Sequence, residues 1–111
     1  MNPKFEVKFL EQAVEYIDSL EEKVRRKVFY NLDKARYVQD PKLFKKLDNE
    51  IWEFRTNYSG QEHRLLAFWV KNKGKTSLVV ATHGFVKKVS KVPKLEIKRA
   101  HFLRDQYLDL L

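Results

Sequence analysis

Cysteine is absent from this chain of 111 residues, and glycine and proline are scarce, with 3 of each. Without cysteine the protein can form neither a disulfide framework nor a thiolate metal site, which fits a reducing compartment. No apolar run approaches the roughly 18 residues that a membrane-spanning helix requires, and charges fill the N-terminus where a signal peptide would be apolar. We therefore expect a cytoplasmic protein with no membrane segment.

Several metal-binding and catalytic motifs are also missing. The 3 histidines have no paired spacing, and no H-E-x-x-H or D-x-D arrangement is present, so we expect no metal site and no cofactor. There is no G-x-x-x-x-G-K-[ST] loop and no G-x-S-x-G elbow. Nucleotide hydrolysis and acyl-serine chemistry therefore lack their usual residues.

Acidic residues are in the minority, and the excess of basic residues lies in the second half of the chain. Residues 1–50 carry eleven basic and ten acidic side chains, whereas residues 51–111 carry twelve and five, a net charge of +7. Such a field favours polyanions, with nucleic acid first and an anionic membrane surface or an acidic protein second. A solvated basic surface without a partner is the alternative.

The first half of the chain predicts one strand followed by two helices. Residues 5–9 alternate apolar and charged side chains, as in a half-buried strand, and the apolar residues of 10–17 follow helical spacing. Ser19 and Glu22 form an S-x-x-E capping box that predicts the start of a second helix, which must end before Asp40-Pro41. The two helices should form an antiparallel hairpin that covers one face of a sheet.

The second half predicts a meander of three strands. The runs Glu50–Asn57, His63–Val70 and Thr76–Lys88 are rich in β-branched and aromatic residues, and turn residues separate them. Asn57–Gln61 supplies the first connection, and Lys71–Lys75 supplies the second as a tight hairpin. We expect residues 40–44, which precede the meander, to form a loop or a single helical turn.

A terminal helix should follow, from Pro93 at its first position to about Leu110. Its candidate packing residues are Leu95, Ala100, Leu103, Tyr107 and Leu110. The resulting order is β-α-α-β-β-β-α, which predicts one α+β domain over residues 1–111.

Charged side chains lie within these apolar strands and need an explanation. Period-two spacing puts Ile51, Glu53 and Arg55 on one face of their strand and Trp52 and Phe54 on the other. The aromatic pair should face the helical hairpin, so Glu53 and Arg55 should point to the more open face. They either pair with each other or belong to a site there.

Arg64 lies at the head of an apolar strand, where its guanidinium needs a carboxylate, phosphate or carbonyl partner. A structural bridge to Glu53 or Glu62 is the alternative to a functional role. His83 precedes Gly84, where the missing side chain would let a ligand or another backbone come close. A purely structural histidine is the alternative for His83.

A concentration of cations follows the last strand. Over residues 87–99 the only acidic residue is Glu96, and the basic residues are Lys87, Lys88, Lys91, Lys94, Lys98 and Arg99. This pattern suits contact with a phosphate backbone.

The segments that hold these residues resemble the RelE/HigB superfamily of bacterial type II toxins, most closely its phage-derived HigB-like branch. The resemblance lies in I-W-E-F-R at Ile51–Arg55, E-H-R-L-L-A-F at Glu62–Phe68 and H-G-F-V-K-K-V-S-K-V-P at His83–Pro93, followed by the P-x-x-E-I-x-x-A helix start. It implies a RelE-like fold, in which a small, twisted, mainly antiparallel sheet holds a concave RNA site opposite the N-terminal helices.

The resemblance also implies a ribosome-dependent endoribonuclease that cuts messenger RNA without a metal and is held inactive by an antitoxin, typically a small helix-turn-helix protein. Arg64 matches the phosphate-binding arginine of the family, and Arg55 matches a basic position on the preceding strand. Glu53 or His83 would transfer a proton. The cationic loop is matched by Lys87 and Lys88, with Lys91 and Lys94 as further RNA contacts.

Two other functions fit the same sequence. One is a ParE-like toxin of the same fold that inhibits a protein such as DNA gyrase. The other is a basic RNA-binding or ribosome-binding module that transfers no proton. The presence of Arg64 together with His83 and the lysines favours the nuclease.

Overall fold

The structure is a computed structural model that describes residues 2–71 and 77–111. Its elements are β1 (Phe5–Phe9), α1 (Glu11–Asp18), α2 (Glu22–Tyr37), β2 (Phe44–Lys46), β3 (Trp52–Tyr58), β4 (Gln61–Val70), β5 (Ser77–Lys87) and α3 (Lys94–Asp109). The hairpin turn expected at Lys71–Lys75 falls largely outside the described residues. Within the described ranges, no helix is both long enough and apolar enough to cross a membrane.

The strands form one sheet in the order β1-β5-β4-β3-β2. The pairs β2–β3, β3–β4 and β4–β5 are antiparallel, whereas β1 lies parallel to β5. A two-residue turn connects β3 to β4, with positive φ at Ser59 (48°) and Gly60 (78°), as hairpin turns of this length require. The predicted α+β class with a mainly antiparallel sheet is confirmed.

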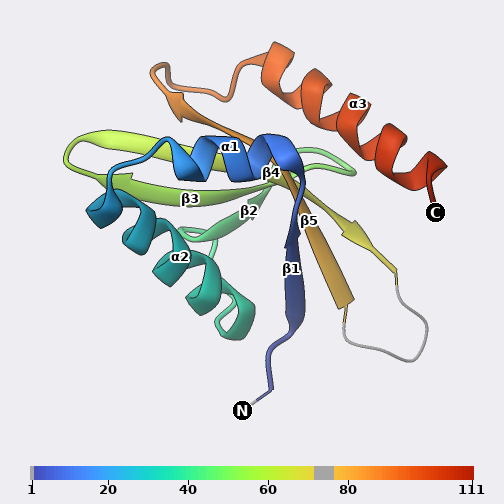
Figure 1. The fold of residues 1–111 in the computed structure, drawn as a ribbon, viewed down its shortest axis with the longest axis horizontal. Coiled ribbons are helices and arrows are strands. Elements are labelled where there is room, and N and C mark those ends of the chain that lie inside the picture. Colours follow the sequence, from blue (N-terminus) through green and yellow to red (C-terminus); the bar gives the residue numbers. More distant parts are fainter. Residues whose placement is uncertain (1, 72–76) are drawn as a thin grey trace.

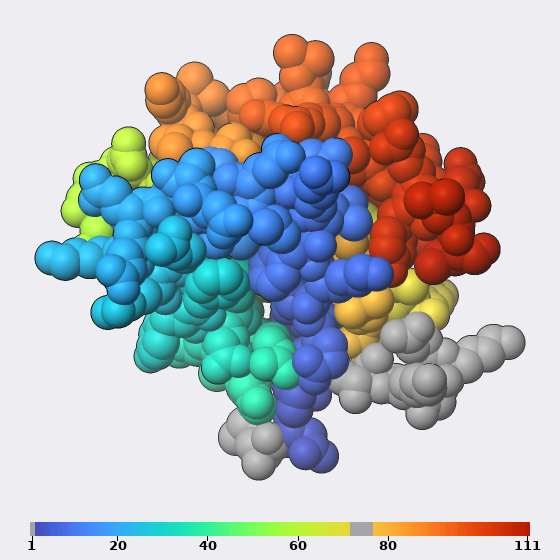
Figure 2. All heavy atoms as spheres, in the orientation of Figure 1, coloured from blue at the N-terminus to red at the C-terminus, as the bar shows by residue number. Residues whose placement is uncertain are grey.

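Helices α1 and α2 lie in front of the sheet in Figure 1, whereas α3 packs on the other face through a separate apolar cluster. Figure 2 shows α1 and α2 covering the face turned to the viewer. Phe54 points to that face and belongs to the apolar cluster under α1 and α2. Ile51 points to the opposite face and belongs to a second cluster under α3. Strand alternation therefore places Glu53 and Arg55 on the α3 side, opposite the helical hairpin, as predicted.

One local prediction about the first half is wrong, and one strand was not predicted, although residues 41–43 do form the expected turn. The capping box does not form: Glu21 is the N-cap of α2 without a side-chain bond, and the Ser19 hydroxyl donates to the Tyr16 carbonyl oxygen (2.6 Å) at the end of α1. Ser19 thus caps the preceding helix. Residues 44–46 form the edge strand β2, which the sequence analysis missed because so short a lysine-rich segment is a strand only through its pairing with β3.

Helix α3 begins one residue later than predicted, with Pro93 as its N-cap. Ala100 and Leu103 are buried as expected, and Tyr107 packs edge-on against Phe68 with ring centroids 5.7 Å apart. The prediction for the two terminal leucines of the helix is wrong, because Leu95 is 78% exposed and Leu110 is 86% exposed. The apolar face of α3 that meets the sheet therefore runs from Ile97 to Leu108 and leaves out both of these leucines.

Candidate functional site

A groove of about 690 Å³ opens on the α3 side of the sheet. It lies between β2 and β3, the end of β5, and the loop that leads into α3. Its charged and hydroxyl-bearing lining residues are Lys45, Glu53, Arg55, Lys87, Ser90, Lys91 and Lys94. This basic groove brings together five residues that the sequence analysis singled out, from strands and a loop that lie far apart in the chain.

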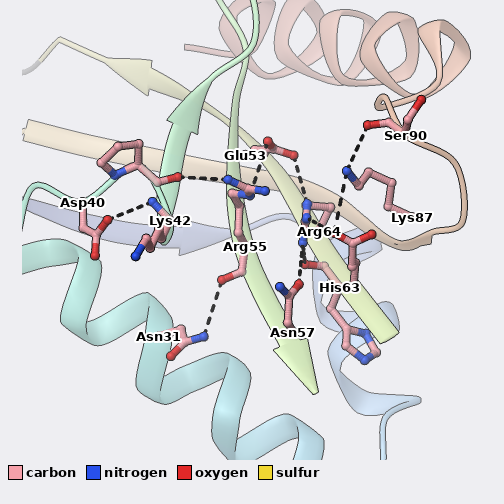
Figure 3. Close-up of polar contacts among 12 residues, drawn as sticks. Asn31, Asp40, Lys42, Glu53, Arg55, Asn57, His63, Arg64, Lys87 and Ser90 are labelled. Atoms are coloured by element: carbon pink, nitrogen blue, oxygen red, sulfur yellow. Dashed lines mark hydrogen bonds and ion pairs between the residues drawn. The ribbon is translucent and has the colours of Figure 1, made fainter. Parts of the chain in front are cut away.

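Glu53 is the only acid in the lining, and its side chain is almost completely buried, at 6% exposure. Its carboxylate lies between two guanidinium groups, with Arg64 Nε at 3.2 Å and Arg55 Nε at 3.8 Å (Figure 3). Neither contact has hydrogen-bond geometry, since Glu53 Oε1 and both Nε atoms are buried without a hydrogen-bond partner among the described residues. Glu53 is therefore held by ion pairs to two guanidinium groups, and its Oε1, which faces Arg64, accepts no hydrogen bond from the described residues.

Arg64 lies behind Glu53 and is 0% exposed. It donates to Glu62 Oε1 (2.9 Å), to the His63 carbonyl oxygen (3.0 Å) and to Asn57 Oδ1 (3.3 Å). Burial lowers the pKa of its guanidinium, whereas the negative charge of Glu53 opposes that shift. Arg64 thus forms ion pairs with both Glu53 and Glu62, the two carboxylates that the sequence analysis named as its alternative structural partners. It does not line the basic groove. Its position suits holding Glu53 in place and does not suit direct contact with a phosphate.

Lys87 is held at the rim of the groove. Its Nζ donates to the Ser90 carbonyl oxygen (3.3 Å) and lies 3.8 Å from Glu62 Oε1. The same Glu62 oxygen accepts from Arg64, so one carboxylate oxygen bridges two cations. Lys88 is exposed and lines a neighbouring hollow of about 480 Å³ that shares Lys87 and Ser90 with the groove.

His83 lies away from this groove, contrary to the role expected of it. It is 1% exposed beneath α3, with Nδ1 3.0 Å from the Thr82 hydroxyl and Nε2 3.2 Å from Glu96 Oε1. Burial, followed by the charge of Arg99, lowers the pKa of its imidazole, although Glu96 acts in the opposite direction. The residue joins α3 to the sheet, so this placement does not support a role in protonating a leaving group.

The room left by Gly84 is used by the protein itself. A Cβ atom at Gly84 would overlap the ring of Tyr16, which reaches across from α1. The Tyr16 hydroxyl lies 2.6 Å from Nδ1 of the buried His63, and burial raises the pKa of Tyr16 to about 12. Gly84 therefore admits a helix side chain to the sheet and not a ligand.

Sequence reasoning missed three members of the site. Lys45 lines the groove from β2, Ser90 positions Lys87, and Asn57 holds Arg64. The Lys45-Lys46 pair was a visible basic signal, but without a predicted strand nothing placed it near Glu53. Among the described residues, no three His, Cys, Asp or Glu side chains gather closely enough to hold a metal ion.

Comparisons with known proteins point to one family. Residues 15–104 match the sequence model of the family described as "Phage derived protein Gp49-like (DUF891)". Among solved structures, the fold is similar to RelE in the archaeal RelE-RelB complex from Pyrococcus horikoshii OT3, with a TM-score of 0.51 and 13% identity over 78% of this chain and 99% of that chain. No curated protein matches.

Proposed function

Since the chain belongs to the Gp49-like phage-derived family, within the RelE/HigB superfamily, we propose that it is the toxin of a type II toxin–antitoxin system and cleaves messenger RNA on the ribosome. The superfamily and the RelE-like fold expected from the sequence are both confirmed. The cleavage reaction, its residues and the ribosome as its setting are the proposal.

The chemistry of RNA makes a metal-free reaction feasible, because the 2′-OH is a nucleophile that the substrate itself supplies. In the proposed reaction this oxygen attacks the adjacent phosphorus, the bond from phosphorus to the 5′-oxygen breaks, and a 2′,3′-cyclic phosphate and a 5′-OH result. Glu53, whose side chain lines the groove, would accept the 2′ proton. Arg64 would act as a positioning residue that holds this carboxylate from behind.

The cations of the groove would stabilise the negative charge that builds on the phosphate. Arg55 is adjacent to Glu53 and partly exposed, and Lys87, Lys91 and Lys94 line the opposite wall. Fixed cations aimed at a developing charge are an effective means of lowering a barrier. Lys87 would also give a proton to the departing 5′-oxygen, since His83 lies outside the groove.

The observation that carries this proposal is the buried Glu53 carboxylate at the base of a basic groove. A groove that only bound RNA phosphates would gain affinity from apolar or cationic residues at this position, because a carboxylate repels a phosphate. A proton acceptor among cations, by contrast, is what attack by the 2′-OH requires.

The test is cleavage of a defined message on ribosomes, read by primer extension. We expect wild type to cut the message, and Glu53→Gln to lose about 10²- to 10⁴-fold in rate, the usual contribution of a general base. Glu15→Gln is the matched control, since Glu15 is an exposed carboxylate on α1. Circular dichroism should show that both variants fold.

Three outcomes would count against the proposal. Equal cutting by Glu53→Gln and wild type would remove Glu53 from the reaction. An intact message with stalled translation would favour the binding module, in which no proton moves. An intact message and normal translation, together with blocked DNA supercoiling, would favour the gyrase-inhibiting alternative.

A further inference from the structure

A second cavity, of about 320 Å³, lies on the other face of the sheet, next to the C-terminal end of α2. Its floor is formed by Phe5, Phe44, Trp52 and Trp69 from four different strands, and Ala35 closes one side. We call it the aromatic pocket. Trp69 remains 36% exposed although residues 63–68 of the same strand are buried. An apolar surface of this kind is stabilised when a partner covers it.

The rings of the floor pack on one another. Phe44 stacks on Trp52 and Phe54, with centroids 4.8 and 4.3 Å apart, and Trp69 meets Phe5 and Trp52 edge-on at 5.1 and 6.0 Å. Ring faces that are already occupied are poor platforms for stacking nucleobases. A concave pocket with apolar walls suits an inserted aliphatic or aromatic side chain.

The mouth of the pocket is basic. Lys4, Lys45 and Lys46 line it and are exposed, whereas Asp40 is the one acid in the lining. A polypeptide that places an apolar side chain in the pocket would therefore bind best if carboxylates flank that side chain.

The two sites of the molecule meet at the edge of the sheet. Lys45 lines both the aromatic pocket and the basic groove, because β2 is the edge strand that separates them. An acidic segment that is anchored in the pocket and continues over β2 reaches Arg55 and the groove directly. Its carboxylates would there compete with RNA phosphates.

We infer that the aromatic pocket receives an apolar side chain from an acidic segment of the partner antitoxin, which then crosses β2 and blocks the basic groove. The identity of this occupant rests on the proposed function. The pocket, its basic rim and its continuity with the groove are observed in the structure and do not depend on that function.

The chain carries its own reporters for a test, since its 2 tryptophans both line the pocket. The probe is a nine-residue peptide of alternating Asp and Glu with a central Leu, titrated to 1 mM in low salt while the two indole N–H signals are followed by NMR. We expect both signals to shift and saturate. Replacing the central Leu by Ser should weaken binding at least about tenfold, because the buried leucine supplies most of the apolar contact.

Charge is tested with matched variants of the protein. Lys46→Glu should weaken peptide binding about three- to tenfold, whereas Lys23→Glu, on an exposed part of α2 outside the pocket, should change it less than twofold. A peptide with Asn and Gln in place of the acids should bind as weakly as the serine peptide.

The outcomes separate the inference from its alternatives. Absence of indole shifts up to 1 mM peptide, or equal binding of the serine peptide, overturns it. Shifts with a nine-nucleotide single-stranded RNA but not with the peptide would make the pocket an RNA site. Message cleavage is scored separately: cutting without peptide binding overturns the pocket inference alone, and peptide binding without cutting overturns the nuclease alone.

Discussion

Arg64 is a buried cation whose charge is balanced by two glutamates, Glu53 and Glu62. Among the described residues, Arg64→Ala would leave the buried Glu53 carboxylate with only the more distant Arg55 as a partner. We expect a loss of about 3–5 kcal/mol in the free energy of unfolding, as for other buried pairs that lose one member. Urea denaturation measures it, and a loss below about 1 kcal/mol would contradict the burial described here.

That cost changes how activity data on this residue are interpreted. An inactive Arg64→Ala protein would not identify a phosphate ligand, because the substitution also frees Glu53 to move. Arg55 and Lys87 are the better probes of charge stabilisation, since both line the groove.

Glu62 places a negative charge beside the groove, where one of its oxygens contacts both Arg64 and Lys87. Its side chain is 40% exposed, so this carboxylate repels an approaching RNA phosphate and neutralises part of the charge of Lys87. We expect Glu62→Gln to bind single-stranded RNA about two- to fivefold more tightly, the range set by a partly exposed ion pair. Fluorescence anisotropy at fixed salt measures this. Weaker binding, or an equal gain in Glu15→Gln, would contradict it.

At the residue level, the sequence identified the right side chains more reliably than their roles. A charge within an apolar strand needs a partner, and Arg64 has the glutamates that were named as its alternative partners. The sequence could not distinguish a buried ion pair with glutamate from an exposed phosphate-binding site, because a carboxylate and a phosphate are equally suitable partners for the Arg64 guanidinium. That distinction depends on which strands are neighbours and on how α3 covers them.

At the level of elements, the sequence predicted those helices and strands whose apolar residues recur at a regular spacing. Both N-terminal helices, β1 and the long strands are recognisable because their apolar spacing is regular over at least five residues. Strand β2 lacks such a repeat and depends on pairing with β3. With β2 missed, the sequence could place neither Lys45 in the groove nor Phe44 in the aromatic pocket.

The contact between α1 and β5 depends on the absence of a side chain at Gly84. Gly84→Ala would push a methyl group into the Tyr16 ring, and overpacking of this kind costs about 1–3 kcal/mol. Thermal unfolding measures the loss. In a Tyr16→Ala background the same substitution should cost distinctly less, since the overlapping ring is gone. Strict additivity of the two changes would contradict this account.

On the scale of the whole molecule, the sheet separates two kinds of surface. The face under α1 and α2 ends in the aromatic pocket, and the face under α3 ends in the basic groove, with β2 as the edge between them. A partner that inhibits the proposed reaction therefore need not resemble RNA. It can gain affinity from apolar contact on one face and reach the groove on the other with a few carboxylates.

The two buried histidines, one on each face of the sheet, should make the fold sensitive to acid. Burial lowers the pKa of His63, with Arg64 adding to the effect, and burial also lowers the pKa of His83. The folded protein therefore keeps both rings neutral at a pH where the unfolded chain, with an ordinary pKa of about 6.5, binds protons. Stability from this source is complete above about pH 6.5 and is lost as the pH falls.

The expected slope is up to about 1.4 kcal/mol of unfolding free energy per pH unit for each histidine, over the interval between its unfolded and folded pKa. Urea denaturation between pH 8 and pH 5 measures it. His83→Gln should be less stable at neutral pH but should show a shallower decline, because one proton-binding group is gone while Glu96, Arg99 and Thr82 remain around the site. A stability that stays level or rises from pH 7 to pH 5.5 would mean that the histidines are protonated within the fold, and that α3 is anchored by a charged His83–Glu96 pair.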